Sequence, residues 1–249
     1  MVQLALITGG AVRIGRAIAL CLAKRGFSVA IQYRSSKAEA EATVAEIQAM
    51  GVRGACFQAN LTEHAEVEGL VPAVGHAMGR VTCLINNAST FADDRIETLS
   101  EESWDKHMAI NLKAPLFIAQ AFAAQLPAEE TGNIVNIIDQ RVLRPNPLFF
   151  SYTLSKSALW AATKTMAQGL APRIRVNSIG PGPTLRSSHQ SEEDFEQECR
   201  STPLGHGATP EEIANAVSFI LGSPAMTGQM IALDGGQHLI WQTPDIRVT

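Results

Sequence analysis

Tyr152 and Lys156 stand four residues apart, and Asp139 precedes the tyrosine by thirteen positions. A spacing of four places two side chains on one face of a helix. Because an ammonium beside a phenol favours the phenolate, the spacing predicts that Lys156 lowers the pKa of Tyr152 and makes it a usable acid. Such pairs also occur by chance, and this one gains weight from Thr8-Gly9 near the start of the chain and Asn86-Asn87-Ala88 midway. Together these residues indicate an oxidoreductase that uses a nicotinamide cofactor.

Apolar segments of strand length alternate with helical patterns, which predicts βαβ units and a parallel sheet. Strands are expected at 4–8, 28–33, 54–58, 82–86, 134–138, 175–178 and 230–233. Helices are expected at 14–24, 37–50, 64–78, 101–125, 151–170 and 210–221. Nearly continuous apolar runs at 4–7 and 134–138 are typical of strands covered on both faces. The expected fold is a single-domain α/β, Rossmann-type, doubly wound parallel sheet of about seven strands with helices on both faces.

The bulk composition indicates one globular domain spanning 1–249, with 46% hydrophobic and 18% charged residues. A net charge of -4 and the lack of any basic run argue against a nucleic-acid partner. No apolar run approaches the roughly 20 residues of a membrane span. Scattered cysteines and the lack of a secretory leader predict a cytoplasmic location, and the histidine spacings predict no metal.

One stretch, 184–209, is irregular in pattern, polar, and acidic around Glu192-Glu193-Asp194. Loops of this length in a compact domain usually cover or line a binding site. We therefore expect a substrate-binding lid at 184–209 within one domain, rather than a linker between two domains.

The turn after the first expected strand reads Thr8-Gly9-Gly10-Ala11-Val12-Arg13-Ile14-Gly15. Glycines in such a turn let the backbone approach a pyrophosphate, which rests on the helix N-terminus. Gly9 and Gly15 have the spacing of T-G-x-x-x-G-x-G, but Arg13 stands where the middle glycine would be. The position of this glycine-rich turn after the first strand of an α/β chain favours dinucleotide binding over a purely structural role.

The end of the second expected strand distinguishes the two nicotinamide cofactors. An acidic residue there usually holds a ribose 2′-hydroxyl, and an arginine holds a 2′-phosphate. The chain has Arg34 and Ser35 at this point and no carboxylate before Glu39. A guanidinium can bind a phosphate through two hydrogen bonds, and Ser35 can donate its hydroxyl. NADP is therefore favoured over NAD, the alternative being that Arg34 is only a surface residue.

The order and spacing of these motifs resemble the short-chain dehydrogenase/reductase family over almost the whole chain. That family has N-N-A-G after the fourth strand, an asparagine on the next helix and P-G after the sixth strand. The corresponding residues here are Asn86-Asn87-Ala88-Ser89, Asn111 and Pro181-Gly182, and the C-terminal T-G-Q and D-G-G at 227–229 and 234–236 also match. The resemblance implies that Asn111 completes a proton relay. It also implies cofactor contacts at Ile14, Asn60, Leu61, Asn87, Ala88, Tyr152, Lys156, Pro181 and Gly182, with an asparagine at 60 where the family usually has aspartate.

Three departures from the family pattern resemble its pteridine reductase branch, which includes bacterial dihydromonapterin reductases. Asp139 replaces the usual catalytic serine, Arg13 replaces a phosphate-turn glycine, and Asn87-Ala88-Ser89 is followed by Thr90-Phe91. The resemblance implies that Arg13 and Ser89 face both the cofactor phosphate and a pterin. It further implies that Phe91 stacks the pterin over the nicotinamide.

Asp139 also changes which substrate is expected on chemical grounds. An ionised carboxylate repels the oxyanion that forms when a ketone is reduced. A carboxyl in a water-poor cleft has a raised pKa and can deliver a proton to a ring nitrogen. We therefore expect Asp139 and Tyr152 to donate the proton in NADPH-dependent reduction of a pterin, while Lys156 holds the nicotinamide ribose. Dihydromonapterin, dihydrofolate and biopterin all fit this expectation.

The same residues also fit other functions. The chain fits a carbonyl reductase of the 3-oxoacyl type, and less well a non-catalytic NADP-binding regulatory or assembly protein, which need not retain Asn111, Tyr152 and Lys156. Asp139 also fits a purely structural role as a polar cap on the fifth strand. The family resemblance implies a homotetramer built through the helices that contain Asn111 and Tyr152. The apolar tail after Asp234, up to Asp245, is expected at a subunit interface.

Overall fold

A sheet of seven parallel strands runs through the middle of the molecule in the order β3-β2-β1-β4-β5-β6-β7. The computed structural model describes residues 3–187 and 190–242. The strands are β1 (Leu4–Thr8), β2 (Ser28–Tyr33), β3 (Gly54–Gln58), β4 (Cys83–Asn86), β5 (Gly132–Ile137), β6 (Ile174–Pro181) and β7 (Met230–Leu233). The predicted α/β, doubly wound sheet is confirmed. Strand β6 runs further than predicted because its last residues pair with β7, Pro181 opposite Leu233.

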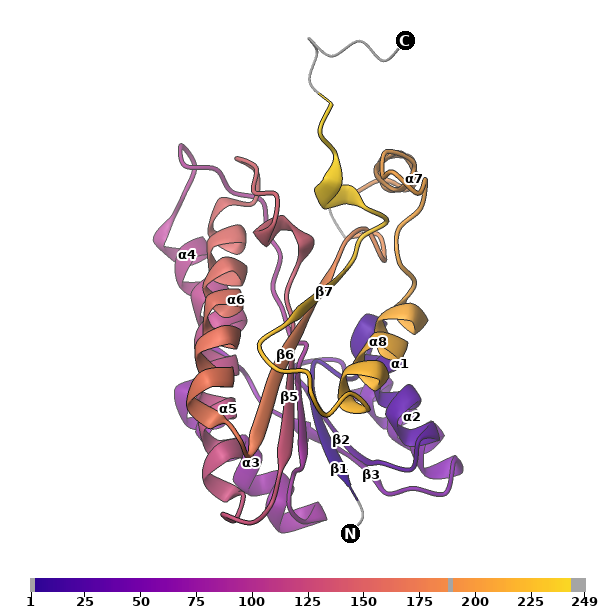
Figure 1. Cartoon of the computed structure of the whole chain (residues 1–249), viewed down its shortest axis with the longest axis vertical. Helices are drawn as coiled ribbons and strands as arrows, with labels where there is room; N and C mark the ends of the chain where they lie inside the picture. Colours follow the sequence, from indigo (N-terminus) through magenta and orange to yellow (C-terminus); the bar gives the residue numbers. More distant parts are fainter. Residues whose placement is uncertain (1–2, 188–189, 243–249) are drawn as a thin grey trace.

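Helices cover both faces of the sheet (Figure 1). One face carries α1 (Arg13–Lys24), α2 (Lys37–Ala49) and α8 (Pro210–Leu221). The other carries α3 (His64–Met78), α4 (Glu101–Met108), α5 (Ala114–Gln125) and α6 (Phe150–Leu170). Each layer buries its own apolar core, one including Ile18 and Val217, the other Ile118 and Phe122. Because β1, β2 and β4 lie between the two cores, every residue in them is buried.

The helical stretch predicted at 101–125 contains a π-helical segment, η1 (Ala109–Lys113), between α4 and α5. Asn111 lies in this segment and is fully buried. Pro115, at the start of α5, has no N–H to donate to the carbonyl of Asn111, so regular α-helical bonding cannot continue there. Single π-turns of this kind frequently occur at functional sites.

The stretch 184–209 was predicted to be irregular, and this prediction is wrong for its middle, which forms α7 (Glu192–Arg200). The Ser191 hydroxyl accepts the Asp194 N–H at 3.1 Å, and the Asp194 carboxylate accepts the Ser191 N–H at 3.3 Å. This capping box starts the helix. None of its residues is buried, so α7 has no apolar stripe for the sequence to reveal.

The predicted subunit interface of the C-terminal tail and the predicted lack of a membrane span can be compared only with the described residues. Part of the predicted tail interface, 243–245, lies outside them, and the described part ends after a short helix, η3 (Gln237–Leu239). Within 3–187 and 190–242, no helix has the length and apolar character needed to cross a bilayer.

Candidate active site

A cavity of about 800 Å³ opens at the carboxyl ends of the central strands. In open parallel sheets, ligands bind at this edge, where the strand order reverses, here between β1 and β4. Most predicted site residues line it: Gly9, Arg13, Ile14, Gly15, Arg34, Asn60, Leu61, Asn87, Ala88, Ser89, Phe91, Asp139, Tyr152, Lys156, Pro181 and Gly182. Ser35 and Asn111 lie outside the lining. The fold therefore brings all the predicted substrate residues, and all the predicted cofactor residues except Ser35, to one site.

The turn after β1 has no room for a side chain at Gly15, where a Cβ would lie 2.2 Å from the Gly9 carbonyl oxygen. Asn87 Nδ2 donates to the carbonyls of Thr8 and Gly9 at 3.0 and 3.1 Å. The Thr8 hydroxyl accepts the N–H groups of Asn87 and Ala88, both at 3.0 Å. These bonds tie the turn to the end of β4 and keep its backbone open to a phosphate. The hydroxyl of Thr8 was not among the predicted site residues.

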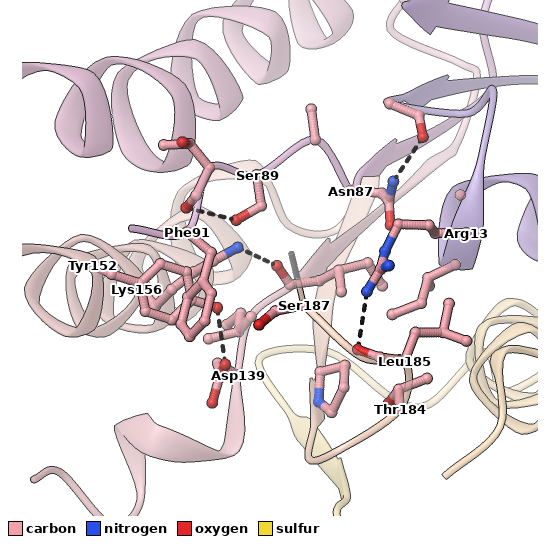
Figure 2. A pocket seen from close by; sticks show the side chains of 18 of the residues that line it. Arg13, Asn87, Ser89, Phe91, Asp139, Tyr152, Lys156, Thr184, Leu185 and Ser187 are labelled. Carbon is pink, nitrogen blue, oxygen red and sulfur yellow. Dashed lines mark hydrogen bonds between the residues drawn. The ribbon is translucent and has the colours of Figure 1, made fainter. Parts of the chain in front are cut away.

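Arg13 adopts a left-handed backbone conformation, with a φ of +54°. This conformation costs a residue with a Cβ roughly 1–2 kcal/mol, which explains why the family has glycine here. Its guanidinium donates to the carbonyls of Arg186 and Leu185 at 3.0 and 2.9 Å, so it links the β1 turn to the segment after β6 (Figure 2). The cofactor and pterin contacts implied for Arg13 stay predictions.

The rim of the cavity beside β2 carries amide and guanidinium groups. The Gln32 amide bridges the Gly9 N–H, at 2.9 Å, and the Ala59 carbonyl, at 2.7 Å. Arg34 is exposed and forms no ion pair within the described part of the chain. Asn60 Oδ1 accepts the Thr62 N–H at 3.3 Å, which leaves its Nδ2 for a ligand. A free guanidinium without a neighbouring acid is the arrangement that a 2′-phosphate requires.

Asp139, Tyr152 and Lys156 meet at the wall of the cavity (Figure 2). The Tyr152 hydroxyl donates to Asp139 Oδ2 at 2.8 Å, and Lys156 Nζ donates to the Ile137 carbonyl at 2.9 Å. Asp139 Oδ1 accepts the Arg141 N–H at 2.8 Å and so caps the short helix η2 (Gln140–Val142). The carboxylate is therefore both a polar cap after β5 and the partner of the phenol.

Burial controls the protonation of these three groups. It raises the pKa of Asp139, as predicted for a carboxyl in a water-poor cleft, and lowers the pKa of Lys156 to about 8. Burial, followed by the charge and hydrogen bond of Asp139, raises the pKa of Tyr152 well above its ordinary value. The prediction that Lys156 lowers the pKa of this phenol is therefore wrong here. Its Nζ lies 5.8 Å from the ring centroid, whereas Asp139 touches the hydroxyl.

Asn111 lies behind the cavity wall and connects the segment after β4 to α6. Its Oδ1 accepts the Thr90 N–H at 2.9 Å and the Ser89 hydroxyl at 3.2 Å. Its Nδ2 donates to the Thr90 carbonyl at 3.0 Å and the Ser155 hydroxyl at 3.1 Å. The side chain thus holds Ser89 and Thr90, the two residues between Ala88 and Phe91, in place, and the implied proton relay stays a prediction.

Phe91 and Phe149 form an aromatic wall, with stacked rings 4.1 Å apart at 14°. Phe91 also meets the ring of Tyr152 edge to face at 4.7 Å, and the Arg141 guanidinium lies 4.9 Å from the Phe149 ring. Phe149 and Arg141 line the cavity but were not predicted. Arg141 was signalled only by its nearness to Asp139. Phe149 is the N-cap residue of α6 and has a φ of +54°, a left-handed conformation that no sequence pattern predicts for a phenylalanine.

Residues 3–197 match the family model described as short chain dehydrogenase. The 3-oxoacyl-[acyl-carrier-protein] reductase FabG of Staphylococcus aureus (strain N315) is 34% identical, over 96% of this chain and 99% of its own length. A crystal structure of FolM alternative dihydrofolate reductase 1 from Brucella suis in complex with NADP is 48% identical, with a TM-score of 0.95 and 98% of both chains covered. A blue fluorescent protein from a metagenomic library, in complex with NADPH, is 32% identical, with a TM-score of 0.88 and 94% and 97% covered.

Proposed function

The chain belongs to the short-chain dehydrogenase family, as predicted, and we propose that it is an NADPH-dependent reductase of a pterin. The observation that carries the proposal is the 2.8 Å hydrogen bond from the Tyr152 hydroxyl to Asp139, at the position of the usual catalytic serine. The similarity to a solved protein described as an alternative dihydrofolate reductase, at 48% identity, supports a pteridine substrate. The predicted homotetramer, which rests on family membership, and the predicted cytoplasmic location, which rests on the cysteine pattern and the N-terminal sequence, are part of this proposal.

The cofactor is NADP(H). The β1 turn is shaped for close approach of a phosphate because Gly15 has no room for a Cβ and Asn87 holds the carbonyls of Thr8 and Gly9 where the turn begins. Arg34 is the group that would hold a 2′-phosphate, with Ser35 beside it in sequence. Two of the solved relatives were crystallised with NADP or NADPH. When bound, the cofactor supplies a hydride.

Asp139 and Tyr152 supply the proton. The high pKa of Tyr152 keeps the phenol protonated at neutral pH, and the raised pKa of Asp139 favours the protonated carboxyl more than an exposed aspartate would. Either group can release its proton to a ring nitrogen, and the hydrogen bond between them lets one reprotonate the other. Help of this kind from a general acid is worth about 10²–10⁴ in rate.

The remaining roles concern the substrate. Phe91 offers an aromatic face to the pterin. Because Phe149 covers one face of Phe91, the pterin ring stacks on the other face of Phe91 or displaces Phe149. Ser89 and Arg13 orient the pterin beside the cofactor phosphates. The 184–209 segment serves as the lid, and the Arg13 guanidinium donates hydrogen bonds to the carbonyls of its residues Leu185 and Arg186.

A 3-oxoacyl reductase is the second candidate, and the 34% identity to the FabG protein favours it. Asp139 counts against it, because its carboxyl replaces the serine hydroxyl that the family uses at this position, and whenever the carboxyl has released its proton its charge repels the oxyanion of a reduced ketone. Consumption of NADPH by the purified protein separates the two candidates. Turnover of dihydropterins or dihydrofolate, but not of a 3-oxoacyl thioester, is expected. Turnover of the thioester alone would refute the pterin assignment.

A further inference from the structure

A buried polar cluster of Asp94, His107 and Ser151 lies directly behind the candidate active site. Asp94 is 3% exposed, and the other two residues are fully buried. None of them lines the cavity, although Ser151 immediately precedes Tyr152 in α6 and the His107 ring lies 6.0 Å from the Tyr152 ring. Burying a carboxylate and an imidazole is costly unless hydrogen bonds compensate for the lost water. Because none of the three residues lines the cavity, the burial of this carboxylate and imidazole is not explained by contact with a reacting group.

Hydrogen bonds satisfy the cluster from both sides. Asp94 Oδ1 accepts the Ser151 N–H at 3.0 Å, and Oδ2 accepts the Ser103 hydroxyl at 2.7 Å and the Ser151 hydroxyl. His107 Nδ1 lies 2.7 Å from the Ser151 hydroxyl oxygen, and Nε2 accepts the Ala92 N–H at 3.2 Å. The cluster thus joins α4, the start of α6 and the segment after β4.

The donors and acceptors assign the protonation of the cluster. Since Nε2 accepts a hydrogen bond, neutral His107 carries its proton on Nδ1 and donates it to Ser151, whose hydroxyl donates to Asp94. Burial lowers the pKa of His107, which favours this neutral form. Burial acts to raise the pKa of Asp94, but hydrogen bonds from Ser151 and Ser103 outweigh it and hold that pKa below its ordinary value. The result is one buried carboxylate held by three donors, a rigid arrangement.

The cluster holds the chain on the C-terminal side of Phe91. Ala92, the next residue, is bound through its N–H to His107, and the Asp94 carbonyl accepts the Phe150 N–H at 3.0 Å. On the other side, Asn111 binds both the N–H and the carbonyl of Thr90. Phe91 is therefore anchored immediately before and immediately after its own position, beside the residue that donates the proton.

We infer that Asp94, His107 and Ser151 are positioning residues that hold Phe91 against Tyr152, so that a flat substrate ring stacks within reach of the proton donor. We call these three residues the Phe91 clamp. This inference rests on the proposed function, in which Phe91 is the platform for the pterin. Because none of the three residues lines the cavity, the clamp acts only through Phe91 and Tyr152.

Asp94→Asn tests the clamp, because an amide cannot accept all three of the donors that the carboxylate holds. Asp93→Asn is the matched control, because it makes the same chemical change at the neighbouring residue and Asp93 is exposed. Asp94→Asn is expected to raise the KM for a 7,8-dihydropterin about tenfold or more, the loss typical of a hydrogen bond to a charged group. The Kd for NADPH, measured by fluorescence titration, is expected to change less than about twofold in both variants. An equal loss of NADPH affinity would show general damage and overturn the inference.

A double-mutant cycle with Phe91→Ala separates positioning from stability. If the clamp acts through Phe91, adding Asp94→Asn to Phe91→Ala changes the KM by less than about twofold. Fully multiplicative effects would overturn the inference. An unchanged KM in Phe91→Ala alone would instead refute the platform role, and with it this part of the proposed function.

Substitutions of His107 provide an independent test in case Asp94→Asn does not fold. His107→Gln keeps a side-chain oxygen that can accept the Ala92 N–H, whereas His107→Leu removes it. The leucine variant is expected to raise the KM for the dihydropterin, and the glutamine variant to restore it most of the way toward the wild-type value. Equal KM values in the two variants would contradict the clamp.

Discussion

Replacing Gly15 with alanine perturbs the β1 turn in a way whose size the structure specifies. The new Cβ would lie 2.2 Å from the Gly9 carbonyl oxygen and 2.5 Å from Asn87 Nδ2, distances that real Cβ contacts do not reach. The Asn87 amide must move, and it loses its bonds to the Thr8 and Gly9 carbonyls. Two such bonds at about 0.5–1.5 kcal/mol each, with about 1–3 kcal/mol for overpacking, predict a total loss of about 2–6 kcal/mol.

The effect is measured as the Kd for NADPH and as the free energy of unfolding in urea. Gly15→Ala is expected to weaken NADPH binding at least about tenfold, because the displaced turn no longer fits a pyrophosphate. Gly69→Ala is the matched control, since Gly69 lies within α3 and a Cβ there meets nothing within 4 Å. That variant is expected to gain about 0.5–1 kcal/mol from helix propensity. A Gly15→Ala protein that binds NADPH and unfolds like the Gly69→Ala protein would show that the close packing of Gly9, Gly15 and Asn87 does not hold the β1 turn.

Three further predictions follow from the site and the exposed surface. The pKa of Lys156 falls from 10.5 to about 8 on folding, so the lysine destabilises the fold below pH 8, and this penalty shrinks as the pH rises toward 10.5. Lys156→Met is therefore expected to abolish reduction yet raise the free energy of unfolding by about 1–2 kcal/mol near neutral pH, allowing for the Ile137 carbonyl left unpaired. Equal stabilisation in urea titrations at neutral and strongly alkaline pH would contradict this. The Arg141 N–H and charge lower the pKa of Asp139. Arg141→Met is expected to raise that pKa and move the alkaline limb of the kcat/KM profile to higher pH, whereas a downward shift would count against Asp139 as the acid. Leu154, 38% exposed on α6, lies in the predicted tetramer interface, whereas Leu204, 68% exposed, lies outside it. Leu154→Asp, but not Leu204→Asp, is expected to reduce the mass seen by light scattering, and a monomeric wild-type protein would rule out the assembly.

The buried strands and the glycine-rich turn could be predicted because each depends only on residues that are neighbours in the sequence. β1 is apolar at four successive positions, and Gly9 to Gly15 follow it directly, so the strand, the turn and its ligand class were predicted from one short segment. The Tyr152–Lys156 pair was readable for the same reason, since a spacing of four residues fixes a shared helix face. The Asp139–Tyr152 contact follows from the family pattern and is confirmed by the 2.8 Å hydrogen bond.

The unpredicted features depend on residues that are distant in the sequence. His107 looks like an isolated histidine, and only the fold brings it to Ser151, 44 residues later. Phe149 reaches Phe91 in the same way. The predicted direction of the Tyr152 pKa shift was wrong because burial and contact with Asp139 raise this pKa, and neither is visible in the spacing. Helix α7 was missed because its start depends on a cap rather than on an apolar stripe.

In the proposed function, the Asp139–Tyr152 pair makes this family member a reductase of pterins rather than of ketones. The most direct measurement compares NADPH oxidation by the wild-type protein and by Asp139→Ser, each with a 7,8-dihydropterin and with a 3-oxoacyl thioester. We predict that Asp139→Ser lowers kcat for the dihydropterin by about 10²–10⁴, the contribution of a general acid, while its activity toward the thioester does not fall. An Asp139→Ser protein that reduces the dihydropterin at the wild-type rate would show that Asp139 does not donate the proton.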